Sequence, residues 1–330
     1  MPASVTNTRS ILLRAAASTL PVSPPRRFRS WQRRSPRCCA EVGAGVRLIA
    51  PRLVPRVWGG ERLKQIVGND STSHASSQEP IGEAWFGEIA DQRPLVKLLD
   101  VQERLSVQVH PDDALASELH GAHAIGKHEA WVILDAAPGA YLLLGRDPAV
   151  GDQEISAALA RGGEIEPLLA RVPVTTGDAL DVPPGTLHAL MPGLLVWEVQ
   201  QPSDLTYRVS DWGRQHADRP LHLREARRAT DAAAAARRLD AIDWTKPGVR
   251  HVVANRAFQV RSVVGPWRGE LIAPRGATLT LVAPAASDVQ ALVGDVELRA
   301  LQSALCEEGS TSLAIPGGAA ALVAEPGRES

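Results

Sequence analysis

Two short stretches carry residue types that could together bind a metal ion. In residues 105–110 apolar and polar side chains alternate, which is typical of a half-buried strand. Because successive side chains of a strand point to opposite faces, Gln108 and His110 share the polar face. Glu129 lies in a second stretch, residues 126–131, where as part of a strand it would share a face with Lys127 and Trp131. If both strands turn these faces toward the interior of one barrel, the three side chains converge into a nitrogen and oxygen ligand set that suits zinc.

A third stretch resembles a known metal-binding motif. Pro183-Pro184-Gly185 is a tight-turn signal between two short strands, and His188 follows it. The spacing of glycine, proline and histidine in residues 177–188 resembles the second motif of the cupins, small β-barrels that hold a metal and use the final histidine as a ligand. There are two departures. Pro192 stands where cupins usually have asparagine, and the first motif, usually two histidines, reads Gln108-Val109-His110.

Six segments in the same order resemble the class I mannose-6-phosphate isomerases, in their short bacterial form. The resemblance covers residues 47–240 well and the last ninety residues weakly. Any one of the segments is weak evidence, whereas six in order are specific. The matching segments are Trp58-Gly59-Gly60, Gly82-Glu83-Ala84-Trp85, Ser106-Val107-Gln108-Val109-His110-Pro111, Gly126-Lys127-His128-Glu129-Ala130-Trp131, Pro183-Pro184-Gly185-Thr186-Leu187-His188-Ala189 and Ser203-Asp204-Leu205-Thr206-Tyr207-Arg208-Val209-Ser210-Asp211-Trp212-Gly213-Arg214.

The resemblance implies a single metal ion, zinc, and the interconversion of mannose 6-phosphate and fructose 6-phosphate through an enediol. Four residues match the metal ligands of the family, although an amide is an unusual zinc ligand in general chemistry. An inward-facing Glu129 is consistent with this, since a buried carboxylate needs a cation. The implied ligands are Gln108, His110, Glu129 and His188.

The same reaction needs cations that bind the phosphate and a base that moves a proton. Arg208 and Lys127 match active-site positions of the family, and Ser106 and Lys97 are further candidates for binding the phosphate. Glu198 is the candidate base, because strand alternation turns it toward the expected cavity. A role in orienting a metal ligand is the alternative for Glu198.

Two other functions are open at this point: another metal-dependent cupin enzyme, either a different sugar-phosphate isomerase or an oxygenase, and a sugar-binding cupin without activity. An oxygenase needs a redox metal on two histidines and one carboxylate, which His110, His188 and Glu129 could supply. The lysine and arginine candidates around them favour an anionic sugar instead. A sugar-binding cupin without activity would be expected to lack a ligand or Arg208, and this chain has them all.

Composition excludes several classes of protein. The net charge of −1 provides no global field for nucleic acid, and no apolar run approaches the roughly 18 residues of a membrane span. Adjacent Cys38 and Cys39 and a single Cys306 are neither a disulfide framework nor a zinc knuckle. We therefore expect a cytoplasmic protein, and the resemblance implies that its partner is a sugar phosphate.

The sequence and the resemblance together predict a mostly β protein, a cupin double-stranded β-helix (jelly roll). Residues 47–240 form the predicted catalytic domain, with a small helical insertion at about 147–172 and a helix over 221–239. Short strand-like runs predict a second, smaller jelly roll over 241–330. Residues 1–46 are rich in arginine and serine, and their first acidic residue is Glu41. We favour a disordered tail there, and an organellar transit peptide is the alternative.

Overall fold

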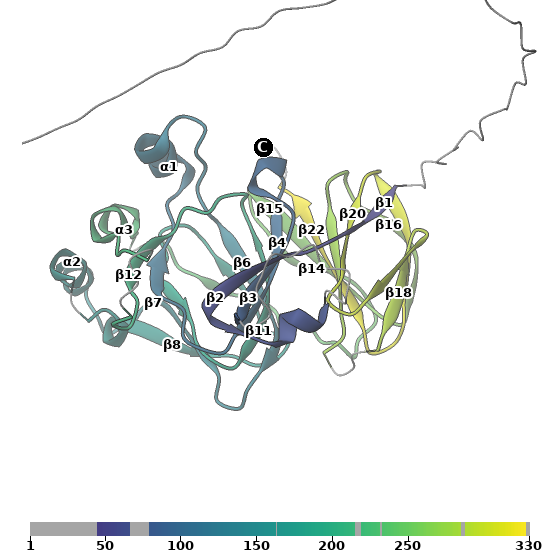
Figure 1. Ribbon diagram of the computed structural model, residues 1–330, viewed down its shortest axis with the longest axis horizontal. Helices are drawn as coiled ribbons and strands as arrows, with labels where there is room; N and C mark the ends of the chain where they lie inside the picture. The colour runs from purple at the N-terminus through teal and green to yellow at the C-terminus, as the bar shows by residue number, and fades with distance from the viewer. Residues whose placement is uncertain are drawn as a thin grey trace, which may run out of the picture. The chain divides into compact units, whose positions relative to one another are not determined.

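The computed structural model describes residues 45–66, 79–162, 164–214, 219–231, 233–284 and 288–327. In this part of the chain four antiparallel sheets form two pairs, and the prediction of a mostly β protein is confirmed (Figure 1). The predicted tail, residues 1–46, lies outside the described residues except for its last two.

The first pair of sheets encloses the site. The larger sheet has the order β13 (Arg237–Arg238), β9 (Ala179–Val182), β6 (Glu129–Ala136), β11 (Leu194–Gln200), β4 (Leu95–Val101), β3 (Ile81–Phe86) and β2 (Arg52–Gly60). The smaller sheet has the order β12 (Tyr207–Ser210), β5 (Val107–Val109), β10 (His188–Leu190), β7 (Tyr141–Arg146) and β8 (Leu169–Pro173). A core that includes Leu99, Trp131, Leu142 and Leu190 lies between them.

The second pair contains the C-terminal strands. One sheet has the order β1 (Val46–Ile49), β20 (Ser303–Cys306), β17 (Thr278–Val282), β22 (Ala320–Pro326), β15 (Phe258–Val264) and β14 (Gly248–Ala254). The other has the order β16 (Trp267–Ile272), β21 (Ser310–Ile315), β18 (Gln290–Val293) and β19 (Val296–Arg299). Leu279, Leu298 and Val323 belong to the core between these two sheets.

The seven-stranded sheet is buried on both faces. Leu99 and Val101 of β4 face the site, while Val96 and Leu98 of the same strand pack with strands of the six-stranded sheet. This explains why β4 and β11 are mostly apolar. The exceptions are Lys97 and Glu198 of the site, Asp100, which pairs with Arg62, and Gln200. In the core between the seven-stranded and six-stranded sheets, Trp197 Nε1 donates a hydrogen bond of 2.9 Å to Thr280 Oγ1.

The first described strand does not pair with its neighbour in sequence. Figure 1 shows β1 running along the C-terminal strands, and residues 46–49 pair with residues 303–306 of β20. Sheet pairing therefore crosses the predicted boundary near residue 240. The division into a catalytic and a C-terminal domain stays a prediction.

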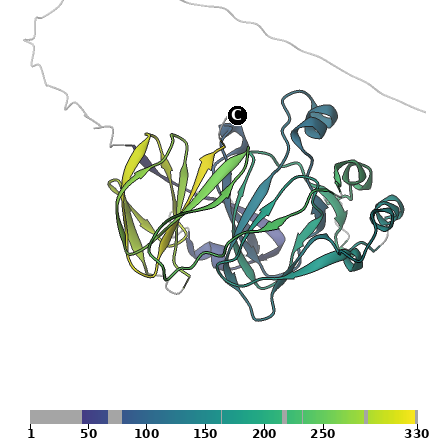
Figure 2. The ribbon, with the colours of Figure 1, turned by 180° about the vertical axis from the view of Figure 1, so that it is seen from behind.

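Helices are few and short in the described part of the chain. They are α1 (Asp113–His120), α2 (Asp152–Arg161) and α3 (Leu223–Ala229), with 3-10 turns η1 (Arg62–Ile66), η3 (Ile89–Asp91) and η4 (Glu166–Leu168). Helices α2 and α3 lie side by side (Figures 1 and 2) and pack Ile155, Leu159 and Ala226 into a core with residues of the five-stranded sheet. The predicted helical insertion is confirmed for α2 and η4, although residues 169–172 belong to strand β8.

The helix predicted over residues 221–239 is shorter than expected. It ends at Ala229, and Arg237–Arg238 instead form β13 at the edge of the seven-stranded sheet. Arg237 pairs with Asp181 at 2.6 Å and Arg238 pairs with Asp178. Backbone pairing with β9 and these ion pairs outweigh the helix propensity of the alanine- and arginine-rich sequence.

Candidate metal centre

Three buried side chains from both sheets of the first pair converge at one point. His110 follows β5, His188 begins β10, and Glu129 begins β6 of the opposite sheet. Their potential ligand atoms all lie within 4.8 Å of one another. Glu129 Oε1 is 3.3 Å from His110 Nε2, and Glu129 Oε2 is 3.5 Å from His188 Nε2. The predicted convergence is therefore present for these three residues.

Each histidine is held so that Nε2 faces the centre of the triad. His110 Nδ1 lies 2.9 Å from the Leu205 carbonyl oxygen, and His188 Nδ1 lies 3.0 Å from that of Thr186. A carbonyl oxygen only accepts, so in the neutral ring the proton is on Nδ1 and the lone pair on Nε2. Burial lowers the pKa of His110, and it lowers the pKa of His188 to about 4. Both imidazoles are thus neutral at pH 7, as metal binding requires.

Two polar atoms of the triad have no hydrogen-bond partner within the described part of the chain. These atoms, His110 Nε2 and Glu129 Oε2, are buried. Burial by itself raises the pKa of Glu129, but the charge of Lys127 and the nearby histidines hold it well below its usual range. The carboxyl group is therefore ionised. A buried carboxylate and a lone pair without a donor are satisfied together by a divalent cation, so these residues fit a metal site.

The fourth predicted ligand, Gln108, lies beside the triad. It is opposite His188 in the pairing of β5 with β10, and its Nε2 is 3.2 Å from His188 Nε2. Its Oε1 accepts a hydrogen bond of 3.3 Å from Ser106 Oγ. The side chain therefore turns its amide nitrogen toward the triad, and rotation of the amide would be needed before its oxygen could act as a ligand.

Two glycines allow the segments that carry the ligands to approach closely. Gly185 has a φ of +87° in the turn closed by the Thr186 N–H to Pro183 carbonyl bond, and its own N–H donates to the His110 carbonyl at 2.9 Å. A Cβ on Gly126 would lie 2.6 Å from the Pro111 carbonyl oxygen. Lys127 N–H donates to that same oxygen at 3.0 Å. Only glycine at these positions brings His188 and Glu129 next to His110.

A cavity of about 590 Å³ opens next to the triad and contains the other predicted site residues. Lys97, Ser106, Lys127, Glu198 and Arg208 all line it, together with the metal-ligand candidates other than His110. The structure thus brings every predicted site residue to one place. The role of each remains a prediction.

The two lysines of the cavity form buried ion pairs. Lys127 Nζ is 2.6 Å from Glu129 Oε1, and Lys97 Nζ is 3.3 Å from Glu198 Oε1. Burial lowers the pKa of Lys97, whereas at Lys127 the charges of Glu129 and Glu198 overcome burial and raise the pKa. Lys127 is therefore a permanent cation at this site.

Glu198 has the environment of a group that can exchange a proton. Its pKa is raised, first by burial and then by the negative charge of Glu129. Trp131 Nε1 donates to its Oε2 at 3.1 Å, which fixes the carboxyl group in the cavity wall. Pairing of β11 with β4 places Glu198 opposite Lys97.

Sequence reasoning assigned no role to several charged residues of the cavity. Arg56 and Glu83 form a bidentate pair with distances of 3.0 and 3.1 Å, and Trp85 Nε1 donates to Glu83 at 2.6 Å. Lys97 Nζ lies 4.4 Å from the centre of the Trp85 ring. Glu83 and Trp85 lie in a segment that resembles the isomerase family, but the alternation of β3 alone does not show which strand faces them. Arg219 is a further lining residue without a sequence signal.

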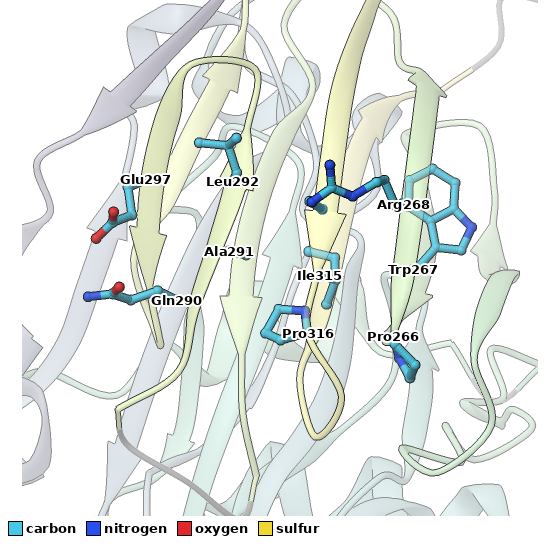
Figure 3. Close-up of a pocket in the computed structure, with 10 residues that line it drawn as sticks. Pro266, Trp267, Arg268, Gln290, Ala291, Leu292, Glu297, Ile315 and Pro316 are labelled. Carbon is cyan, nitrogen blue, oxygen red and sulfur yellow. The ribbon is translucent and has the colours of Figure 1, made fainter.

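A second hollow of about 630 Å³ lies on the four-stranded C-terminal sheet. Figure 3 shows its lining side chains on β16, β18, β19 and β21, among them Trp267, Leu292 and Ile315. Arg268 and Glu297, its charged residues, stand on strands β16 and β19 at opposite edges of the sheet. Among the described residues, no group of histidine and carboxylate side chains suited to a metal lies here.

No family model matches the chain, but curated proteins do. A probable mannose-6-phosphate isomerase, GmuF of Bacillus subtilis, is 36% identical over 54% of this chain and 66% of its own length. Mannose-6-phosphate isomerase ManA of the same organism is 39% identical over 53% of this chain and 65% of its own length. Mannose-6-phosphate isomerase of Streptococcus mutans is 34% identical over 52% of this chain and 63% of its own length. The matched region thus spans just under two thirds of each of these relatives.

Solved structures extend the likeness to most of the fold. The mannose 6-phosphate isomerase structure from Bacillus subtilis superposes with a TM-score of 0.68 at 25% identity and covers 85% of this chain and 99% of its own. A putative mannosephosphate isomerase from Archaeoglobus fulgidus, 19% identical, has the same fold with a TM-score of 0.65, covering 88% of this chain and 100% of its own. These likenesses confirm the predicted cupin-type fold. No described helix is both long and apolar enough to cross a membrane.

Proposed function

Since the chain is a homologue of the mannose-6-phosphate isomerases, we propose that it interconverts mannose 6-phosphate and fructose 6-phosphate through an enediol. The observation that carries the proposal is the buried triad with its unsatisfied His110 Nε2 and Glu129 Oε2, next to a cavity lined by cationic side chains. An oxygenase could use the same triad. The lysines and arginines of the cavity suit a phosphorylated sugar, and the relatives are named as isomerases.

One zinc ion is the cofactor of this proposal. His110, His188 and Glu129 would hold it, and Gln108 would complete the set with its amide oxygen. When bound, the ion acts as a Lewis acid that stabilises negative charge on the substrate oxygens. Lys127, at 2.6 Å from Glu129, balances the charge of the carboxylate ligand and remains protonated.

Glu198 is proposed to move the proton between C2 and C1 of the sugar. Its raised pKa places it nearer neutrality than an ordinary carboxyl group, which favours both taking up and returning a proton. Lys97 at 3.3 Å and Trp131 at 3.1 Å hold its two oxygens in place. Arg208 supplies positive charge for the phosphate or the enediolate, and Ser106 and Lys97 are the other proposed substrate contacts.

A coupled assay tests the proposed function directly. Purified protein should convert mannose 6-phosphate to fructose 6-phosphate, lose this activity on treatment with a chelator, and regain it when zinc is returned. Elemental analysis should find about one zinc per chain, and Mn²⁺, Co²⁺ and Ni²⁺ should be compared in the reconstitution. Absence of fructose 6-phosphate from metal-loaded protein would overturn the proposal.

A further inference from the structure

The positive charges of the cavity are not equally available to a ligand. Lys97, Lys127 and Arg56 each form an ion pair with a carboxylate of the same cavity. Arg208 forms none among the described residues, and its buried Nε has no hydrogen-bond partner there. The position of its side chain is set by one bond of 3.0 Å from Nη1 to the Pro220 carbonyl. Unpaired positive charge therefore lies at Arg208.

The segment that follows residue 218 is tied to Arg208 by its backbone. His222 N–H donates to the Arg208 carbonyl at 2.7 Å, and Arg208 N–H donates to His222 Nδ1 at 3.2 Å. Together with the Arg208 bond to Pro220, these contacts hold Arg219, which precedes Pro220, next to Arg208 at the cavity wall. Both side chains line the same cavity, and the positive charge of Arg219 contributes to lowering the pKa of Arg208, although ten residues separate them in sequence.

A buried carboxylate holds Arg219 in place. Asp211 accepts hydrogen bonds from Arg219 Nε at 3.0 Å and Nη2 at 3.2 Å, and from Arg214 Nη2 at 2.7 Å. Because a guanidinium group has five N–H donors, Arg219 has Nη1 and one Nη2 hydrogen without a partner among the described residues. Three arginines against one carboxylate leave a surplus of two positive charges, partly offset by the exposed Asp204 at the same cavity. A sugar phosphate carries about −1.5 to −2 at pH 7.

We propose that Arg208 and Arg219 together form the binding site for the phosphate group of the substrate, and that Asp211 positions Arg219 for this contact. Paired forks of N–H donors match the oxygens of a phosphate, and the charge surplus of the cluster matches its charge. Arg219 acts in affinity and in discrimination between a phosphorylated and a free sugar, not in proton transfer. The proposal rests on the proposed function and adds to it the residue that selects the phosphate.

The test compares the full-length, zinc-loaded protein with its Arg219→Ala variant. Calorimetry should show binding of mannose 6-phosphate and of inorganic phosphate weakened about 10- to 100-fold in the variant. KM for mannose 6-phosphate should rise by a similar factor with kcat changed little. The reason is that a contact with the phosphate stabilises the bound substrate and the transition state equally. Any binding or turnover of unphosphorylated mannose should be the same in both proteins. Arg228→Ala, which removes an exposed ion pair of α3 with Glu118 outside this cavity, is the matched control and should behave as wild type.

The outcomes separate the two proposals. Unchanged binding of mannose 6-phosphate and phosphate by a folded Arg219→Ala protein would overturn the assignment of Arg219 and leave the isomerase function standing. Wild-type protein that binds both ligands but makes no fructose 6-phosphate would overturn the proposed function alone. If Arg219→Ala does not fold, Arg219→Lys takes its place, because it keeps the charge next to Asp211 but not the fork. It should bind mannose 6-phosphate less tightly than wild type, and wild-type affinity would contradict the proposal.

Discussion

Two hollows in the described part of the chain have similar volumes, about 590 Å³ in the N-terminal pair of sheets and 630 Å³ on the C-terminal sheet, but different linings. The first gathers buried Lys97, Glu198 and Glu129 from the neighbouring strands β4, β11 and β6 of one sheet, and Lys127 from the loop before β6. The second is lined mainly by apolar side chains, with its two charged residues on separate strands (Figure 3). Convergence of buried charge, and not the size of a hollow, distinguishes a candidate site.

The difference has an energetic reason. Taking a charge out of water costs several kcal/mol per ion, so a fold bears such a cost where the charges pair with one another or serve a ligand. The first hollow shows both cases, because its lysines pair with carboxylates while His110 Nε2 and Glu129 Oε2 stay unsatisfied. In the C-terminal hollow, Arg268 and Glu297 are exposed, and neither forms an ion pair with a described residue. The predictions below test this contrast, beginning with the largest expected effect.

Replacing His110 by alanine should abolish activity. It removes one of three buried ligands, and even the loss of groups that only support ligands costs about 10- to 100-fold in metal affinity or activity. We expect substoichiometric zinc by elemental analysis and a fall in kcat of more than 100-fold, with the fold retained by circular dichroism. A variant that keeps both zinc and turnover would show that the triad is not the metal site.

Arg208→Ala should lower kcat/KM by about 100-fold or more, equivalent to roughly 2.7–4 kcal/mol of transition-state stabilisation. An exposed arginine without a role would instead change stability by about 0.5 kcal/mol and leave the rate alone. Arg208→Lys should restore only part of the loss, since it keeps the charge without the fork. Steady-state kinetics of the wild type, Arg208→Ala and Arg208→Lys measure both effects. Near wild-type kcat and KM in Arg208→Ala would show that the substrate lies elsewhere in the cavity.

Much of this site could be predicted from the sequence because local alternation carries the information. Strand periodicity turns Gln108, His110 and Glu198 to the expected face, and the Pro-Pro-Gly turn marks the approach to His188. Resemblance to a family supplied the roles that spacing alone left open. The N-cap Asp112, whose side chain accepts from Leu115 N–H at 2.8 Å, is a local signal for the start of α1.

Long-range contacts account for what could not be predicted. Pairing of β1 with β20 depends on residues more than 250 positions apart, and nothing local to residues 46–49 indicates the partner. Arg219 reaches the cavity because Asp211 and the backbone of Arg208 hold its segment there. The end of α3 at Ala229 likewise follows from pairing of β13 with β9, which overrides local helix propensity.

Thr280→Val tests whether the C-terminal strands affect the N-terminal pair of sheets only through the stability of the fold. Thr280 Oγ1 accepts the Trp197 Nε1 hydrogen bond at 2.9 Å, and both side chains are fully buried. Loss of the acceptor leaves a buried donor unsatisfied, so we expect about 1–3 kcal/mol lower stability in urea unfolding with kcat and KM unchanged. The double variant with Trp197→Phe gives the coupling of the pair in a mutant cycle. A large fall in kcat at full stability would show that this contact acts on the chemistry.

Asp211→Asn should lower stability by about 1–2 kcal/mol at pH 7, and this loss should depend on pH. Burial by itself raises the pKa of Asp211, but its contacts with Arg219 and Arg214 hold the pKa below the usual value. A carboxylate with a lowered folded-state pKa contributes stability above its unfolded pKa of about 3.9, and this contribution is lost as the pH falls through the folded value. Urea unfolding of both proteins from pH 7 to pH 3 should therefore show the difference shrinking on acidification. A constant difference would mean that the charge of Asp211 does not stabilise the fold.

The smallest effect is expected from the double variant Arg268→Ala, Glu297→Ala, which removes the charged residues of the C-terminal hollow. Both side chains are exposed, and neither has an ion pair within the described part of the chain. Surface substitutions of this kind change stability by about 0.5 kcal/mol or less, so we expect unchanged urea unfolding and unchanged steady-state kinetics. The zinc content should also match that of wild type, because the triad draws its ligands from the other pair of sheets. A tenfold loss of kcat/KM would contradict the contrast between the two hollows, since an apolar hollow with dispersed charges would then take part in the reaction.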